Sequence, residues 1–344
     1  MESSFDLLFD TFARHRVLIV GDVMVDAYVW GRVERVSPEA PVPVVRVNRR
    51  ESRLGGAANV ALNVQALGAT PLLCAVVGTD APGDAFRQLL VDQGIATDYV
   101  VSSSERTTTV KERVIAGPQQ VVRIDDEHDH LLSDSEREAL LSAADQALVQ
   151  ADVVIFQDYD KGVLSEAVIR HITERAQQRG IPVAVDPKKR NFLHYHNASL
   201  FKPNLKELRQ GLQQERLALH HETYAPLHSE PAAIREAAAT LRGLLHHQIT
   251  LITRSEKGVF IDTDTDEAHF MPAHVRQIAD VSGAGDTVIS IAALCLASAA
   301  PLPTLAALAN LGGGIVCEYT GVVPISRDRL LTEANEHLAG GVKG

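Results

Sequence analysis

The chain has 344 residues, of which 45% are hydrophobic and 22% charged, and its formal net charge is −11. These proportions are typical of soluble globular proteins and exclude bulk disorder. The acidic balance and the lack of a basic stripe argue against nucleic acid or an anionic membrane as a partner. Residues 1–16 lack the apolar core of a signal peptide, and the longest apolar stretch, 288–300, is too short to span a bilayer. We therefore expect a cytoplasmic protein.

The three cysteines are scattered along the chain and show neither disulfide nor zinc spacing. They are Cys74, Cys295 and Cys317. We expect buried, reduced thiols that behave as small hydrophobic side chains.

Short apolar runs alternate with helical patterns in much of the chain, and polar residues follow each run. Helical patterns cover residues 165–179 and 232–246. Continuous apolar strands alternating with helices are typical of a parallel sheet covered on both faces, with ligands at the carboxyl ends of the strands. The expected fold class is therefore α/β. The predicted strands lie at 17–20, 72–77, 153–156, 183–185 and 250–253.

Two segments break this alternation. Residues 28–48 combine valines with three prolines, and residues 107–125 alternate around a Gly117-Pro118 turn. Together they predict a small antiparallel sheet that forms a lid from parts of 25–50 and 105–125, or a surface hairpin with no role in the site. The expected organisation is a single domain, 1–335, with a surface excursion at 213–231 and a tail at 336–344.

The most informative motif is Gly283-Ala284-Gly285-Asp286, which precedes an apolar helix expected to start near Val288. Bare backbone N–H groups at a helix N-terminus bind anions, because unpaired donors and the helix dipole both face the ligand. An aspartate beside a bound phosphate could accept the proton of an attacking hydroxyl. The alternative is a glycine-rich turn in which Asp286 is an ordinary residue at a helix start.

Small and polar residues elsewhere suit a sugar. Gly55 and Gly56 would let a ligand approach the backbone, and Asn59 can both donate and accept hydrogen bonds. Asp22 and Asp26, after the first strand, could bind vicinal hydroxyls. Tight helix packing would explain the glycines equally well.

Two further segments are candidates for nucleotide contacts. Asn204 and Glu207, three residues apart, share a helix face with Leu205 and Lys206 between them, and could hold Mg²⁺ through water. A capping box explains the same spacing. The segment 253–258, with Thr253, Arg254, Ser255 and Gly258, could line a triphosphate or form a plain turn.

Several classes of nucleotide-binding protein are excluded by missing motifs. The chain contains neither a GxxxxGK[ST] sequence nor the protein-kinase signatures, and Gly21-Asp22-Val23-Met24-Val25-Asp26 replaces a dinucleotide-binding glycine fingerprint.

The motifs occur together in the order and spacing of one family. In the residues 17–22, 55–59, 204–207 and 280–286, the chain resembles the ribokinase-like carbohydrate kinases, also called the PfkB family. The resemblance implies a ribokinase-like fold with Asp286 as catalytic base and the backbone of 283–285 as anion hole. It also implies ATP and Mg²⁺ as cofactors, allows a monovalent cation such as K⁺, and places Asn310 near the adenine.

Within the family, the chain looks like the kinases of D-glycero-β-D-manno-heptose 7-phosphate, which act in lipopolysaccharide precursor synthesis. The stretches 35–44, 123–127, 158–162 and 186–188 carry this likeness. A sugar phosphate needs cations remote from the transferred phosphate, and we expect Lys188, Lys161 and Arg123 there, beside Asp186.

The resemblance leaves rivals open: a kinase for another sugar, such as fructose 6-phosphate or ribose, and a non-catalytic module that binds sugar phosphates. Ser255 stands where many relatives have glycine, and no HxGH-type motif follows, so we expect the kinase alone. The lid strands predict a homodimer, since an exposed strand edge needs covering.

Overall fold

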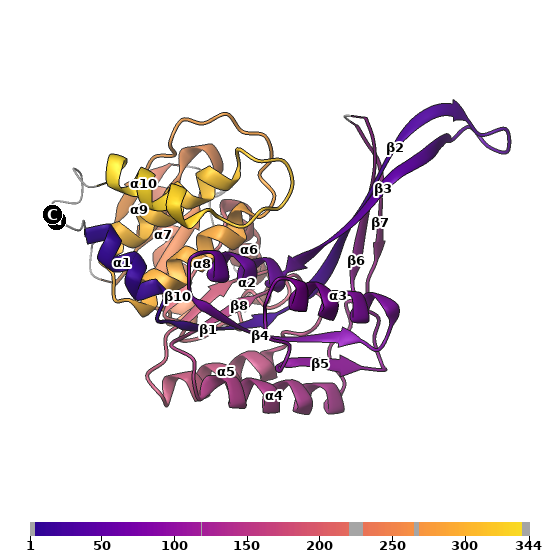
Figure 1. The fold of residues 1–344 in the computed structure, drawn as a ribbon. Helices are drawn as coiled ribbons and strands as arrows, with labels where there is room; N and C mark the ends of the chain where they lie inside the picture. The colour runs from indigo at the N-terminus through magenta and orange to yellow at the C-terminus, as the bar shows by residue number, and fades with distance from the viewer. Residues whose placement is uncertain (1–3, 118, 220–229, 265–267, 339–344) are drawn as a thin grey trace.

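The computed structural model describes residues 4–338 except 118, 220–229 and 265–267 (Figure 1). It confirms an α/β architecture of a large sheet, flanking helices and a small second sheet. The elements are α1 Ser4–Phe12, β1 Arg16–Gly21, β2 Val23–Val36, β3 Pro43–Gly56, α2 Ala57–Ala66, β4 Thr70–Gly78, α3 Ala81–Asp92, β5 Val100–Ser103, β6 Val110–Ala116, β7 Gln119–Asp126, α4 Asp134–Leu148, β8 Val153–Gln157, α5 Glu166–Gln177, β9 Val183–Asp186, β10 Leu200–Phe201, α6 Leu205–Leu219, α7 Pro231–Leu245, β11 Ile249–Thr253, the 3₁₀ turn η1 Ser255–Lys257, β12 Val259–Asp262, β13 His269–Met271, α8 Ala284–Ala297, α9 Leu302–Val316 and α10 Arg327–His337.

The main sheet has the strand order β13-β12-β11-β10-β9-β8-β1-β4-β5. All neighbouring pairs from β11 to β5 are parallel, whereas β12 and β13 add antiparallel to the edge. The carboxyl ends of β1, β8, β9 and β10 therefore lie side by side at one edge of the sheet. The polar residues that follow these four strands meet there.

Helices cover both faces of this sheet, which explains why its central strands are apolar throughout (Figure 1). Successive side chains of a strand point to opposite faces. In β1, Val17 and Ile19 pack into one core with α2, α8 and α9, whereas Leu18 and Val20 pack into a second core with α4, α5 and α7.

The second sheet has the order β3-β2-β6-β7 and projects from the body as the predicted lid (Figure 1). Strands β2–β3 and β6–β7 are antiparallel, but β2 and β6 pair in parallel, with Val25 opposite Val110. The sheet is therefore mixed, because the two hairpins come from distant parts of the chain. Strand β2 begins at Val23 and β3 ends at Gly56, so these strands extend beyond the expected segment 25–50 at both ends.

Other boundaries differ from expectation in instructive ways. Helix α8 starts at Ala284, inside the glycine motif, rather than near Val288. Helix α6 extends to Leu219 into the expected surface excursion, whose residues 220–229 lie outside the described part, as do tail residues 339–344. Cys74, Cys295 and Cys317 are all free and buried. Within the described ranges, no helix is both long and apolar enough to cross a membrane.

Candidate active site

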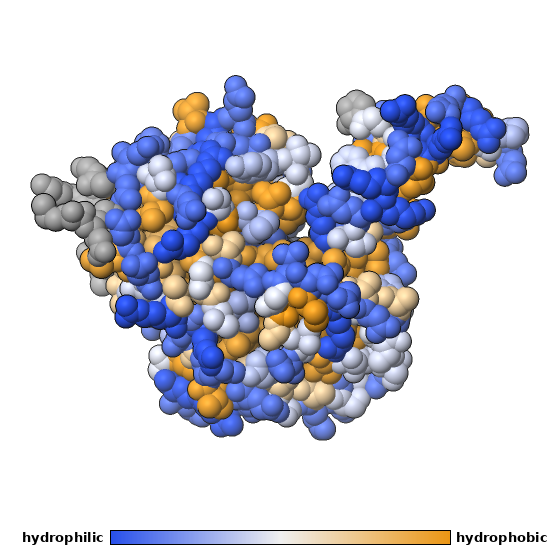
Figure 2. Space-filling view, viewed as in Figure 1, coloured by the Kyte–Doolittle hydropathy of each residue, from blue (hydrophilic) through white to orange (hydrophobic). Residues whose placement is uncertain are grey.

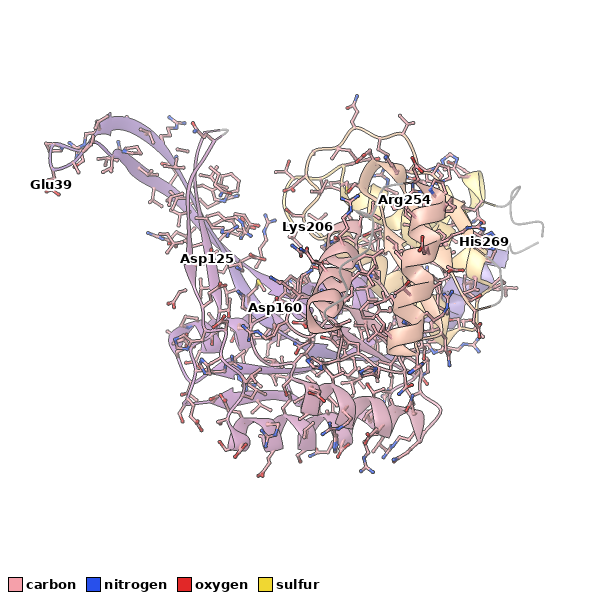
Figure 3. The ribbon with its side chains drawn as sticks, turned by 180° about the vertical axis from the view of Figure 1, so that it is seen from behind. Glu39, Asp125, Asp160, Lys206, Arg254 and His269 are labelled. Carbon is pink, nitrogen blue, oxygen red and sulfur yellow. The ribbon has the colours of Figure 1, made fainter. Side chains whose placement is uncertain are left out.

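The candidate site is a cleft of about 170 Å³ where the lid meets the body, above the carboxyl ends of the central strands. Seen from behind, Asp160 lies at the foot of the lid, Lys206 at the start of α6, and Glu39 at the far tip of the lid (Figure 3). The cleft is lined by Met24, Asp26, Gly55, Gly56, Asn59, Lys111, Arg113, Tyr159, Gly283, Asp286 and Val322.

Asp286 lies in the first turn of α8 and is only 6% exposed. Three side chains donate hydrogen bonds to its carboxylate. The Tyr159 hydroxyl and Gln157 Nε2 lie 2.7 and 3.2 Å from Oδ1, and Asn59 Nδ2 lies 2.6 Å from Oδ2. Burial raises the pKa of Asp286 to about 6, and the bonds from Asn59 and Tyr159 limit the rise. The carboxylate is therefore desolvated, held in place and ionised near neutral pH, as a general base must be.

Two amide oxygens beside this carboxylate are buried hydrogen-bond acceptors without a donor among the described residues. In the described ranges, no group donates to Asn59 Oδ1 or Gln157 Oε1. Both amides have a fixed orientation, because their NH₂ groups face carboxylates; Gln157 Nε2 also lies 3.3 Å from Asp186 Oδ2. A buried acceptor without a donor is costly. Asn59, which lines the cleft, is thus suited to accept a hydrogen bond from a ligand hydroxyl.

The N-terminus of α8 fits a phosphate. Gly283 is the N-cap residue in the left-handed conformation, with φ 80°, and no side chain of the described residues caps this end. The amides of Ala284 and Gly285 begin the helix behind it. The Ala284 amide donates to the Val281 carbonyl at 3.3 Å, and Gly283 and Asp286 line the cleft. The positive end of the helix dipole therefore faces the cleft, and the anion hole at 283–285 stays a prediction.

Asp186 and Lys202 form a buried ion pair below the cleft, with Lys202 Nζ 3.0 Å from Asp186 Oδ1. A Cβ on Gly285 would lie 3.7 Å from both side chains, so the pair lies directly under the anion hole. The Asp186 charge raises the pKa of Asp286, whereas Lys202 lowers it. Asp186 is 4% exposed. Its contacts support the base and give no sign of the sugar contact expected from the sequence.

Asp22 is bound to the main chain. Its Oδ2 accepts from the amides of Tyr159 and Lys161, and its Oδ1 from that of Val163. The side chain is 1% exposed. These bonds hold the loop after β8, and we therefore do not place Asp22 among the sugar ligands.

The two glycines at the end of β3 allow the lid to join the body closely. A Cβ on Gly55 would lie 2.3 Å from Asp26 Oδ2, and Gly56 adopts φ 63° beside the Asp22 carbonyl. Asp26 in turn accepts from Arg113 at 2.6 Å. The guanidinium groups of Arg53 and Arg113 both lie over the Tyr28 ring, at 5.0 and 5.4 Å from its centroid. The lid thus brings cations to the cleft wall.

The three lysine and arginine candidates for a remote phosphate lie apart. Lys188 Nζ is 2.5 Å from Glu207 Oε1. Burial alone would lower the pKa of Lys188, but the charges of Asp186, Glu207 and Asp286 raise it overall. Lys188 is therefore held against Glu207, at the start of α6. Lys161 pairs with Glu127 at 2.7 Å, and Arg123 is exposed on β7 and pairs with Asp125.

Asn204 and Glu207 form the capping box that the spacing also allowed. Asn204 N donates to Glu207 Oε2 and Glu207 N to Asn204 Oδ1, both at 2.9 Å. Leu205 and Lys206 form the first turn of α6, with Lys206 exposed. Among the described residues, no group of three His, Cys, Asp or Glu could hold a metal. An outer role for the pair, holding Mg²⁺ through water, stays a prediction.

Of the remaining nucleotide candidates, Thr253 lies next to this box. Thr253 ends β11 and bridges Asn204, and Ser255 begins the η1 turn, which ends before Gly258. Arg254 lies 5.0 Å over the Phe270 ring. Asn310, on α9, donates to the Pro272 carbonyl at 2.8 Å and so holds the loop before α8. None of these contacts involves the Asp286 cleft.

Four side chains that matter here were missed by the sequence analysis: Gln157, Tyr159, Lys202 and Arg113. Gln157 and Tyr159 follow the predicted strand 153–156 within three residues, so the rule that ligands lie at strand ends could have found them. Lys202 and Arg113 carried no such signal, because no predicted strand ends directly before Lys202 and Arg113 is one of several arginines in the lid hairpins.

Comparison with known proteins gives a consistent result. The chain matches the pfkB family of carbohydrate kinases over residues 14–328. It is 39% identical over 333 residues to the "Bifunctional protein HldE" of Gluconacetobacter diazotrophicus, covering 97% of this chain and 66% of that one. The HldE protein of Caulobacter vibrioides is 40% identical over 323 residues, covering 93% and 64%. The chain thus spans just under two thirds of the length of these curated relatives.

Solved structures agree on the fold. Phosphofructokinase-2 from Escherichia coli in complex with potassium aligns with a TM-score of 0.75 at 18% identity, covering 94% of this chain and 99% of that one. Arabidopsis thaliana ribokinase complexed with ribose and ATP aligns with a TM-score of 0.69 at 18% identity, covering 92% and 98%. The lid, the parallel sheet and the glycine-bounded helix start are thus a ribokinase-like fold. By sequence and by fold, the chain belongs to the pfkB family of carbohydrate kinases, which transfer a phosphoryl group to a sugar hydroxyl.

Proposed function

We propose that the protein transfers the γ-phosphate of ATP to the C1 hydroxyl of D-glycero-β-D-manno-heptose 7-phosphate, giving the 1,7-bisphosphate for ADP-heptose and lipopolysaccharide synthesis in the cytoplasm. The observation that carries the kinase chemistry is Asp286, a buried, triply hydrogen-bonded carboxylate in the first turn of a helix whose N-terminus is capped by no described side chain. The likeness of residues 35–44, 123–127, 158–162 and 186–188 to heptose 7-phosphate kinases, and the similarity to HldE proteins, support the choice of sugar.

In the proposed mechanism, Asp286 takes the proton of the C1 hydroxyl as that oxygen attacks the γ-phosphorus in line. The amides at 283–285 stabilise the negative charge on the transferred group. Mg²⁺ supplies charge neutralisation on the ATP phosphates, and Asn204 and Glu207 would hold it through water. A monovalent cation such as K⁺ belongs to the same proposal.

Lys188 and the buried Lys202 contribute positive charge at this end of the cleft. Because Lys188 pairs with Glu207 beside the Asp286 carboxylate, we assign it to the transferred phosphate rather than to the 7-phosphate. This revises the role expected from the sequence.

At the other end, we assign the 7-phosphate to lid cations. Arg113 and Lys111 both line the cleft, whereas Arg123 lies farther out on β7. The guanidinium group of Arg113 can donate two parallel hydrogen bonds to phosphate oxygens, and Lys111 adds a second positive charge. Lys111 lies 3.0 Å from Glu127, which also pairs with Lys161. A bound phosphate would therefore compete with Glu127 for Lys111.

We further propose a homodimer through the lid. Its outer part carries exposed apolar side chains, and Figure 2 shows hydrophobic surface along the projecting sheet. A hollow of about 690 Å³ lies there, lined by residues that include Val33, Pro43 and Val121. A contiguous exposed apolar surface marks an interface. The exposed residues are Val33, Val36, Val42, Val47, Val122 and Ile124.

A substrate panel tests the proposed function. ADP release from ATP and Mg²⁺ is measured with the heptose 7-phosphate, fructose 6-phosphate and ribose. We expect fast turnover with the heptose phosphate alone. Turnover with another sugar would retain the base and the anion hole but reject the substrate; no turnover with any sugar would favour a binding module.

A further inference from the structure

One half-buried tyrosine that lines the cleft contacts the candidate base and has no assigned task. Tyr159 follows β8, and its hydroxyl donates to Asp286 Oδ1 at 2.7 Å. Gln157 fills the second acceptor position of the same oxygen at 3.2 Å, and Asn59 fills one position of Oδ2 at 2.6 Å. A carboxylate offers about four acceptor positions. Counted over the described residues, these donors leave one position, on Oδ2.

The loop that carries Tyr159 is held rigidly. Asp22 accepts from the backbone amides of Tyr159 and Lys161 at 2.8 and 3.1 Å. Asp160 adopts φ 57°, a conformation that non-glycine residues rarely adopt, and its amide is held by Asp158 at 2.8 Å. The Tyr159 ring itself lies 5.7 Å from Lys188 Nζ. The hydroxyl is thus fixed from the main chain and from the ring.

We infer that Tyr159 is a positioning residue for phosphoryl transfer: its hydroxyl holds Oδ1 of Asp286, so that Oδ2 is the oxygen that takes the proton from the sugar. The inference rests on the proposed function. Tyr159 cannot act as an acid itself, because its hydroxyl is already engaged with Asp286, and burial followed by the Asp286 charge raises its pKa well above the ordinary value. Its effect on the reaction therefore passes through the carboxylate.

The charge on Asp286 depends on the groups around it. Asn59 of α2, Gln157 at the end of β8, Tyr159 after β8 and Lys202 after β10 favour the ionised form, whereas burial and Asp186 at the end of β9 oppose it. Lys188 also interacts electrostatically with Asp286. Losing the short Tyr159 bond therefore makes Asp286 harder to ionise. A hydrogen bond to a charged group corresponds to about one to two pKa units.

The test compares two tyrosines of equal chemistry. Tyr195 is fully buried, and its hydroxyl donates to a different carboxylate, Asp158 Oδ2, at 2.7 Å. Turnover is measured from pH 5 to 9 for the wild type, Tyr159→Phe and Tyr195→Phe. We expect the acidic limb of kcat to move up by about one to two pH units in Tyr159→Phe only. At pH 6, where about half of the wild-type Asp286 is ionised, this corresponds to about a fivefold to fiftyfold loss that is recovered toward pH 9, with KM for ATP and sugar unchanged.

Other outcomes decide against the inference. A loss of turnover in Tyr159→Phe that is equal at every pH indicates a merely structural role and overturns it. An acidic limb of kcat that moves equally in Tyr195→Phe also overturns the inference. Gln157→Met, which removes the longer bond to Oδ1, should move the limb in the same direction by less.

A second measurement does not depend on turnover. The pKa of Asp286 is read by ¹³C NMR of protein labelled at aspartate carboxyls, with Asp286→Asn to assign the signal. A higher pKa in Tyr159→Phe supports the inference, and an unchanged pKa overturns it. If no sugar is phosphorylated, the proposed function fails, but this titration still decides the role of Tyr159.

Discussion

Replacing Asp286 with asparagine should abolish catalysis and stabilise the fold at the same time. Asp286 is nearly isosteric with asparagine, and its pKa rises from 3.8 to about 6 on burial. A carboxyl whose pKa is higher in the folded than in the unfolded protein imposes a penalty on the unfolding free energy when it is ionised. The penalty is therefore absent below pH 3.8, grows between pH 3.8 and 6, and is complete above pH 6.

The size of this effect follows from the shift of about two units. At 1.36 kcal/mol per unit, the ionised carboxylate costs about 3 kcal/mol of unfolding free energy at pH 7.5 and about 1 kcal/mol at pH 4.5. Asp286→Asn removes this cost. Its new NH₂ group would face Asn59 Nδ2, but Asn59 can turn, since no described group donates to its Oδ1.

The assay is urea unfolding of both proteins at pH 7.5 and 4.5, together with turnover at pH 7.5. We expect the variant to be more stable by up to about 3 kcal/mol at pH 7.5, with a smaller gap at pH 4.5. Turnover should fall by about 10²–10⁴-fold, the usual contribution of a general base. A variant that is less stable at both pH values would refute the desolvation argument. Full activity would refute the role of Asp286 as base.

Three further predictions test other parts of the site. Lys188→Met should lower kcat/KM for ATP by at least about tenfold and leave KM for the sugar phosphate unchanged, because we assign its partner Glu207 to the nucleotide. Steady-state kinetics with both substrates varied will test this, and a raised KM for the sugar phosphate would contradict it. Arg113→Gln should raise KM for the sugar phosphate by about tenfold, and Arg123→Gln, the matched control, should not; equal effects would return Arg123 to the phosphate site. Gly283→Ala should lower the unfolding free energy by about 1–2 kcal/mol, because alanine is strained at a φ of 80°. In the same urea unfolding assay, Gly243→Ala should raise it by about 0.5–1 kcal/mol, because a Cβ at this position of α7 meets no neighbouring atom.

The sequence was most informative where one local pattern dominates. The apolar runs predicted the central strands because a strand buried on both faces must be apolar at every position, as Val17 to Val20 are. The glycines at 283–285 predicted a helix start with an anion hole. The helix start is found there, with α8 beginning at Ala284 rather than near Val288, and the anion hole stays a prediction.

The sequence was least informative where long-range pairing decides. Arg113 and Arg123 are paired residues of one hairpin, and Arg113, on the inner strand β6, lines the cleft, whereas Arg123 lies on the edge strand β7. Likewise, Asp22 looked like a sugar ligand until the loop after β8, more than a hundred residues later, supplied three amides to its carboxylate. Lys188 could be assigned to the nucleotide end only once Glu207 was seen beside it.

The most direct test of the account is ³¹P NMR of the reaction of the wild-type protein with ATP, Mg²⁺ and D-glycero-β-D-manno-heptose 7-phosphate. The account predicts a new signal for a phosphate on C1, the retained 7-phosphate signal, and one ADP for each product formed. Conversion of ATP to ADP without a phosphate on C1, or no reaction beyond that of Asp286→Asn, would contradict it.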